Sequence, residues 1–111
     1  MFARLTTYDL DAENASDAAE GFQPAIDRIR SLDGLVEAFF LVECDGSRGV
    51  SITLWESMDS MERSRVAASR ARSEAAEEIG AEVTSTYEYK VGIRAGSAPV
   101  DDGAARTPPA A

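Results

Sequence analysis

Two arginines on one face of a helix are the residues whose type and spacing point most directly to chemistry. Arg65 and Arg72 are seven residues apart, so they lie almost one above the other on a helix that turns about 100° per residue. A guanidinium is permanently charged and offers a planar fork of donors to an anion. One interpretation is that both border a pocket and hold an anionic organic ligand, such as an acidic aromatic or a ketoacid enolate.

A structural interpretation of the same two arginines remains open. Their long stems can pass the small side chain of Ala68 and carry the charge to Glu56, to Glu37 or to a carboxylate of a partner subunit. The two interpretations require different interiors. A cavity of roughly 300 Å³ or more holding an unpaired Arg65 or Arg72 favours ligand chemistry. Two ion-paired arginines and a filled interior favour a non-catalytic binding or regulatory module.

Strand-like segments supply the other candidate site residues. Tyr87 has a phenolic proton to donate to an oxygenated intermediate. Trp55, Thr53, Phe40 and Tyr8 are candidates for contacts with a bound ligand, although strand aromatics more often serve only to pack.

The composition excludes several kinds of site and partner. The chain has 111 residues, no histidine and one cysteine, so it cannot build a histidine-ligated metal site, a Ser-His nucleophile or a thiolate zinc cage. We expect no metal. Twenty acidic residues against eleven basic ones give a formal charge of −9, which argues against nucleic acid and anionic membranes as partners. The lone thiol and the absence of an apolar leader at residues 1–8 favour a cytoplasmic location.

The elements that must position these residues follow the order β-α-β-β-α-β. Strands are expected at residues 2–9, 35–44, 49–55 and 83–93, because β-favouring or alternating residues recur there. A first helix follows the apolar stripe from Ala15 to Leu32, with Asn14 or Ser16 as its cap and Gly34 as its stop. Pro24 should kink this helix near Glu20 or restart it near Gln23.

The second helix should cover residues 57–79, with Asp59 and Glu62 as a capping box and Gly80 as its stop. This order predicts an α+β, ferredoxin-like fold, in which a four-stranded antiparallel sheet carries two helices on one face. Residues 1–94 should form that domain. Residues 95–111 are rich in Ala, Pro and Gly and should form a flexible tail.

The hairpin at Asp45-Gly46 predicts which side chains share a face of the sheet. Its two-residue loop pairs Cys44 with Ser47. One face is then fully apolar, and we expect it to meet the helices; it carries Phe39, Leu41, Val50, Ile52 and Leu54. The other face is left uncovered and combines apolar residues with Ser51, Thr53 and Trp55. A bare, largely apolar face predicts a partner, and sheet-to-sheet homodimerisation would supply it.

At this level of detail the chain resembles the dimeric α/β-barrel superfamily, and within it the antibiotic-biosynthesis-monooxygenase-like domain. The resemblance spans nearly all of residues 1–94. It rests on the element order, on Leu-Asp-Gly-Leu at 32–35 and on Ser-Ile-Thr-Leu-Trp-Glu-Ser at 51–57. It implies a homodimer that binds a small organic ligand. If the chain is an enzyme, the resemblance implies cofactor-independent oxygenation, with Arg65 or Arg72 stabilising an enolate and a tyrosine donating a proton.

The haem-degrading members of that superfamily require residues that this chain lacks. The resemblance implies an Asn on the first strand, a Trp at the end of the third and a His on the following helix. Here Trp55 is present, the first strand offers Thr6 and Thr7, and Arg65 stands about where the His would be. We therefore expect no haem degradation by that route.

Overall fold

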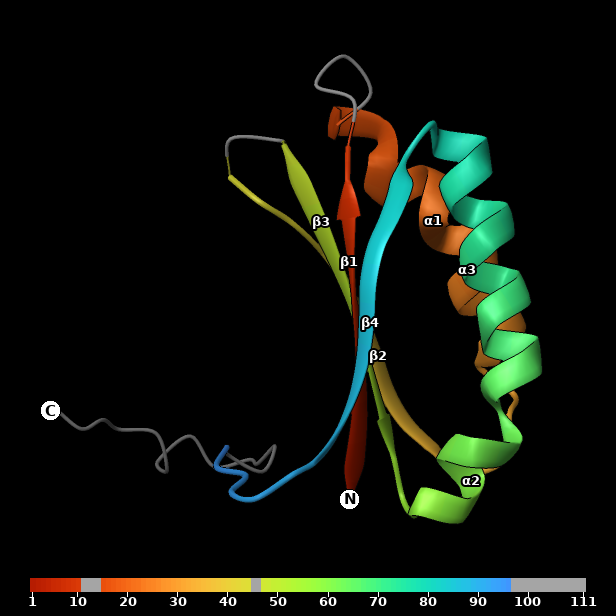
Figure 1. The fold of residues 1–111 in the computed structure, drawn as a ribbon, viewed down its shortest axis with the longest axis vertical. Coiled ribbons are helices and arrows are strands. Elements are labelled where there is room, and N and C mark those ends of the chain that lie inside the picture. The colour runs from red at the N-terminus through yellow and green to blue at the C-terminus, as the bar shows by residue number, and fades with distance from the viewer. Residues whose placement is uncertain (11–14, 45–46, 97–111) are drawn as a thin grey trace, which may run out of the picture.

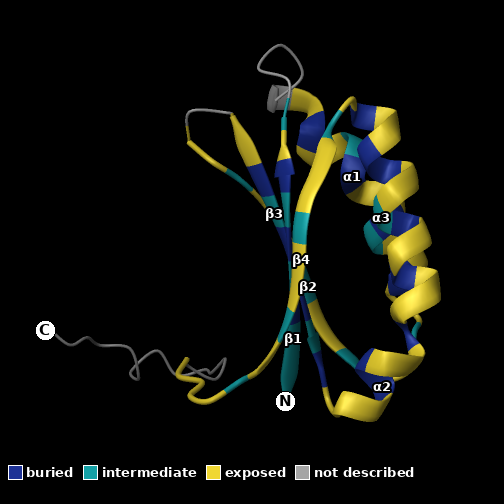
Figure 2. Ribbon diagram, in the orientation of Figure 1, coloured by how far each residue is buried: buried dark blue, intermediate teal, exposed yellow. Residues whose placement is uncertain are grey.

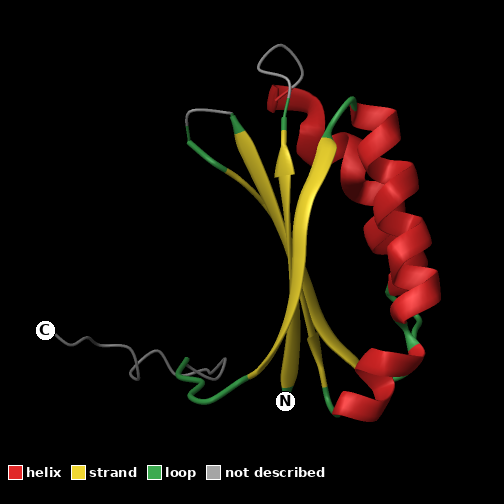
Figure 3. Ribbon diagram, viewed as in Figure 1, coloured by secondary structure: helices red, strands yellow, loops and turns green. Residues whose placement is uncertain are grey.

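The computed structural model describes residues 1–10, 15–44 and 47–96, and within them it has the predicted order of elements. The elements are β1 (Phe2–Asp9), α1 (Ala15–Ile29), β2 (Leu35–Val42), β3 (Arg48–Trp55), α2 (Met58–Arg63), α3 (Arg65–Ile79) and β4 (Glu82–Lys90). All strand pairs are antiparallel, in the order β2-β3-β1-β4. The helices lie on one side of the sheet (Figures 1 and 3). The predicted ferredoxin-like α+β class is confirmed.

Three sequence predictions fall outside the described residues. They concern the tip of the hairpin at Asp45-Gly46, the cap of the first helix at Asn14 and the tail beyond residue 96. The hairpin register itself is visible in the flanking strands, because Val42 lies opposite Gly49. That pairing continues the predicted register of the hairpin.

The second predicted helix is two helices that meet at Ser64. The hydroxyl of Ser64 donates to the carbonyl of Met61 at 2.7 Å, a local side-chain bond that competes with regular helix. The capping box that begins α2 pairs Ser57 with Ser60, so the predicted pair of Asp59 and Glu62 is wrong. Gly80 ends α3 with a φ of 71°, as its lack of a Cβ predicts.

Pro24 lies inside α1 without dividing it. The helix runs from Ala15 to Ile29, and Pro24 is exposed on its outer side. Gly34 has a φ of 81°, but it lies in the turn that leads to β2 rather than at the end of the helix. No described helix is long and apolar enough to cross a lipid bilayer.

The two faces of the sheet are the reverse of the sequence prediction. Tyr8, Thr6, Ser51 and Trp55 are buried. Tyr8 packs in one core cluster with side chains of α1 and α3, so this polar face is the one that the helices cover; Figure 2 colours the ribbon by burial. The apolar face stands open, and it carries the residues predicted to meet the helices: Phe39, Leu41, Val50, Ile52 and Leu54. Phe39 is 41 % exposed and Leu41 48 %. Alternation shows which residues share a face, but it does not show which face the helices cover.

Candidate functional site

Hydroxyl groups line the sheet face beneath the helices and satisfy one another. The hydroxyls of Tyr8 and Ser51 lie 2.8 Å apart, and those of Thr6 and Thr86 lie 3.1 Å apart. The indole Nε1 of Trp55 donates to Thr53 Oγ1 at 2.9 Å. Burying a polar group costs little once it has such a partner. This network explains how a polar face comes to be covered while an apolar face remains open.

An aromatic cluster closes one end of this layer. The ring of Phe22 stacks on Phe40 with centroids 4.2 Å apart, and Tyr8 meets Phe22 edge-on at 5.3 Å. Burial is the main cause that raises the pKa of Tyr8, while the hydrogen bond from Ser51 and the nearby charge of Arg72 oppose the rise. Tyr8 therefore stays protonated at neutral pH and can act as a hydrogen-bond donor.

Arg4 is the most completely bonded charged group of the interior. It is 3 % exposed, and its guanidinium donates to Glu88 Oε2 at 2.9 and 3.0 Å, to Ser64 Oγ at 3.2 Å and to the Met61 carbonyl at 2.8 Å. The same guanidinium lies 5.8 Å from the centre of the Trp55 ring, within range of a cation–π contact. These bonds tie β1, β4 and the α2–α3 junction together.

Glu88 also holds Arg65. The exposed Arg65 donates through Nε and Nη2 to the two carboxylate oxygens of Glu88. The bond from Arg65, followed by the bond and the charge of Arg4, lowers the pKa of Glu88 from 4.5 to about 2. Arg65 therefore follows the structural interpretation, with Glu88 as a partner that the sequence analysis did not name.

Arg72 differs from both of these arginines. Among the described residues its guanidinium makes no hydrogen bond and no ion pair, although the side chain is partly buried. Burial lowers its pKa, and the charge of Arg4 adds to that effect. The guanidinium stays charged at neutral pH because the ordinary pKa of arginine is so high. Arg72 thus presents a partly desolvated cation with no carboxylate bound to it.

Arg72 borders two adjoining spaces. Inside lies a cavity of about 20 Å³, whose floor includes Thr53. Outside lies an open groove of about 490 Å³ between α3 and β4, which Arg65 and Tyr87 also border. Arg4 and Arg72 line both spaces. The cavity is far smaller than the roughly 300 Å³ expected of an organic ligand pocket.

The structure places four candidate residues on one face of the sheet, but only Thr53 of these lines the cavity. Trp55, Thr53, Phe40 and Tyr8 all lie on the helix-covered face. Tyr87 is different: it pairs with Leu5, and alternation along β4 directs its ring away from Glu88 toward the open face. Its side chain is 60 % exposed. Tyr8 is fully buried and lines neither the cavity nor the groove.

The sequence analysis missed Arg4 and Glu88, which organise the site. The signal that would have found Arg4 is its place two residues before Thr6 and four before Tyr8, which sets all three on one face of a strand.

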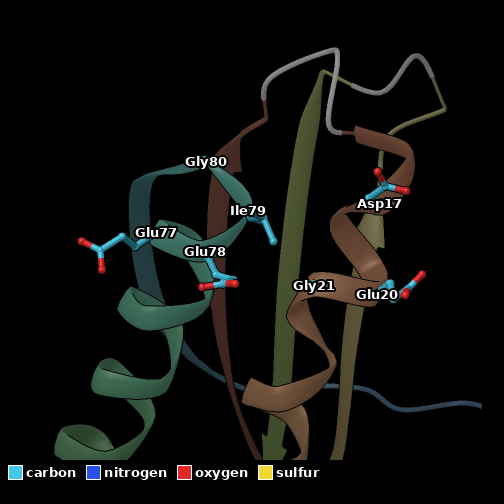
Figure 4. Close-up of a pocket in the computed structure, with 7 residues that line it drawn as sticks. All are labelled: Asp17, Glu20, Gly21, Glu77, Glu78, Ile79 and Gly80. Carbon is cyan, nitrogen blue, oxygen red and sulfur yellow. The ribbon is translucent and has the colours of Figure 1, made fainter.

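A larger hollow, of about 700 Å³, lies elsewhere, between α1 and the end of α3 (Figure 4). Its rim carries Asp17, Glu20, Glu77 and Glu78, all exposed. These carboxylates would repel an anion. Among the described residues, no group of three His, Cys, Asp or Glu side chains is arranged to hold a metal.

Comparison with known sequences identifies no function. No family model matches the chain. Two proteins of Mycobacterium tuberculosis strains, both called uncharacterized (MT2635 and Rv2558), are each 39 % identical to it over 66 residues. That match covers 59 % of this chain but only 28 % of each relative. The chain therefore corresponds to a minor part of these longer proteins.

Comparison with solved structures identifies the fold. A putative antibiotic biosynthesis monooxygenase from Deinococcus radiodurans matches with a TM-score of 0.68 and 14 % identity, covering 89 % of this chain and all of its own. SnoaB, a cofactor-independent oxygenase from Streptomyces nogalater, matches with 0.66 and 12 %, covering 84 % and 94 %. The monooxygenase ActVA-Orf6 of Streptomyces coelicolor, solved with nanaomycin D, matches with 0.62 and 19 %, covering 89 % and 92 %. The chain has the fold of the antibiotic-biosynthesis-monooxygenase-like proteins, as its resemblance to them predicted.

Proposed function

We propose that this chain forms a homodimer, that each protomer binds a small planar organic anion at Arg72, and that cofactor-independent monooxygenation of that anion is its activity. The observation that carries the proposal is the unpaired guanidinium of Arg72 beside a groove. A partly desolvated charge without a counter-ion is costly. A bound carboxylate, phenolate or enolate would offset that cost with charge-assisted hydrogen bonds.

The charges around the groove support an anionic ligand. Arg4, Arg65 and Arg72 face the single carboxylate of Glu88, so the groove carries two positive charges in excess. The chain as a whole carries a formal charge of −9. A local excess of positive charge on an otherwise acidic protein attracts small anions to the groove.

The chemistry follows from enolate formation. In anthrone, a suitable probe, one C–H proton leaves and the enolate reduces O₂. A carbon–oxygen bond then forms, the oxygen–oxygen bond breaks, and the products are anthraquinone and one water. Arg72 would stabilise the negative oxygen as charge builds up.

The open sheet face supports the homodimer. It presents Leu5, Ile52 and Leu54 in its centre, with Tyr87 and Tyr89 beside them on β4. No described element of the same chain covers it (Figure 1). Burying a contiguous apolar surface of this kind against a second copy is favourable.

The test of the binding site compares two arginines of α3. Wild type, Arg72→Ala and Arg70→Ala are titrated with 1-hydroxy-2-naphthoate, followed by its fluorescence. Arg70 is exposed on the same helix and serves as the control. Loss of a charge-assisted contact should weaken binding by about ten- to a hundred-fold in Arg72→Ala alone. Equal dissociation constants for the three proteins would remove Arg72 from the site.

The second candidate function is a dimeric binding or regulatory module without oxygenase activity. Two observations favour it: the interior cavity is only about 20 Å³, and Arg65 is bound to Glu88. An oxygen electrode separates the two functions. Oxygen uptake with anthrone that depends on Arg72 supports the oxygenase. Tight binding of the naphthoate with no uptake supports the module.

A further inference from the structure

The interior cavity beneath α3 is too small for an organic substrate. Its volume is about 20 Å³, far below the roughly 300 Å³ expected of an organic ligand pocket. We propose that this cavity is the dioxygen site, and that the organic anion lies outside it in the α3–β4 groove. This inference rests on the proposed oxygenase function and says where its second substrate binds.

The walls of the cavity suit a small apolar molecule. Its upper side is formed by side chains of the two helices: Phe22, Ala25, Ile26, Ile29, Ala68 and Ala71. The alanines of α3 leave the space, since any longer side chain there would fill it. A cavity with such walls stays dry and accepts apolar guests.

The polar groups of its floor are already engaged with neighbours. Thr6 is bonded to Thr86, Ser51 to Tyr8 and Thr53 to Trp55. A buried water typically needs two to four polar partners. Arg4 and Arg72 also line the cavity, and of these polar side chains only Arg72 has no hydrogen-bond partner among the described residues. A water in the cavity would therefore find fewer partners than it needs, whereas dioxygen needs none.

Arg72 lies where the two substrates would meet. It lines both the cavity and the groove of about 490 Å³. A carbanion in the groove would pass an electron to dioxygen in the cavity, and the two radicals would then join through a carbon–oxygen bond. Reduced oxygen is anionic, so the guanidinium would stabilise it as it forms. The distal oxygen would leave as water, with the two hydrogens lost from the substrate carbon.

Filling the cavity tests the assignment. In Ala71→Leu the added side chain would occupy the space, whereas Ala67→Leu adds the same atoms at an exposed position of α3. We expect the KM for oxygen in anthrone oxidation to rise at least tenfold in Ala71→Leu. The KM for anthrone should stay within twofold of wild type, and Ala67→Leu should match wild type in both.

Xenon binding to the wild-type protein tests the cavity without any variant and without a measurement of activity. A crystal of the wild-type protein under xenon pressure should show one xenon atom enclosed by Ala71, Ile29 and Thr53. An ordered water in its place, or an unchanged KM for oxygen in a folded Ala71→Leu, would overturn the dioxygen site. Absence of any oxygen uptake by wild type would overturn the proposed function, and the dioxygen role with it. Xenon binding would then mark only a dry cavity.

Discussion

The two faces of this sheet carry opposite chemistry, and the polar face is the covered one. Beneath the helices lie the hydroxyls of Thr6, Ser51 and Thr53 together with the buried Arg4. On the other side stand exposed aliphatic and aromatic side chains such as Leu41 and Tyr89. Pairing between hydroxyls offsets the cost of burying the first face, whereas an exposed apolar face is typical of an interaction surface. The proposed ligand chemistry belongs to the covered side of the sheet and the proposed assembly to the open side.

The same contrast appears among three arginines on the covered side. Arg4 is buried and bonded to Glu88, Ser64 and Met61. Arg65 is exposed and bonded to Glu88. Arg72 is partly buried, and no hydrogen bond or ion pair joins it to any described residue. A buried structural arginine such as Arg4 should be costly to remove, whereas an exposed ion-paired arginine or a ligand-binding arginine should not.

The largest expected effect comes from a charge at the centre of the open face. Ile52 lies between Leu5 and Phe39 on the neighbouring strands. Ile52→Glu should raise the dissociation constant of the dimer at least a hundredfold, about 2.7 kcal/mol, because a carboxylate would be buried without a partner. Analytical ultracentrifugation across micromolar concentrations measures this. Val66→Glu, at a position 73 % exposed on α3, is the control. A wild-type monomer would refute the assembly role outright.

The next effect should come from Arg4. Arg4→Met removes its four hydrogen bonds and leaves the Met61 carbonyl without this donor. We expect the free energy of unfolding to fall by about 2–4 kcal/mol, as for a buried charge pair broken from one side. Arg65→Met should lower the free energy of unfolding much less, because that side chain is exposed to solvent. Urea denaturation measures both. Equal losses of unfolding free energy in the two variants would contradict the expectation that the buried Arg4 stabilises the fold more than the exposed Arg65.

A smaller effect should appear in acid. The folded-state pKa of Glu88 is about 2, below its ordinary 4.5, so the ionised carboxylate stabilises the fold above pH 4.5. That contribution is lost as the pH falls from 4.5 toward 2. Its size should be about 1–2 kcal/mol, because the exposure of Arg65 weakens the pair. Urea midpoints measured between pH 5 and 2 should show this loss in wild type. If the urea midpoint of Glu88→Gln falls with pH as steeply as that of wild type, the loss of stability in acid comes from other carboxylates.

Much of this arrangement could be predicted from residue patterns, and the failures depend on individual side-chain hydrogen bonds. Alternation and turn residues predicted β1, the hairpin register and the end of α3 at Gly80. They could not show which face the helices cover, because that depends on hydroxyl pairs between strands, such as Tyr8 with Ser51. The break at Ser64 has a different, local cause, because the Ser64 hydroxyl donates to the Met61 carbonyl.

The candidate site was predicted as a set of residues rather than as roles. The helical stripe identified Arg65 and Arg72 together, but only the fold separates them. Glu88 is 23 residues from Arg65 and 84 from Arg4 in the chain, so local spacing does not reveal the shared carboxylate. Arg72 is distinguished by what it lacks, and a sequence pattern cannot express a missing partner.

The smallest expected effect is also the sharpest test of the contrast between the arginines. Arg72→Leu removes a partly desolvated charge that no described residue pairs, so the free energy of unfolding should stay within about 1 kcal/mol of wild type or rise. Thermal shift with 1-hydroxy-2-naphthoate should show stabilisation of wild type and none of the variant, because a ligand stabilises only the state that binds it. A loss of stability as large as that of Arg4→Met would place Arg72 among the structural arginines. The ligand role would then fall, while the assembly role of the open face would stand unaffected.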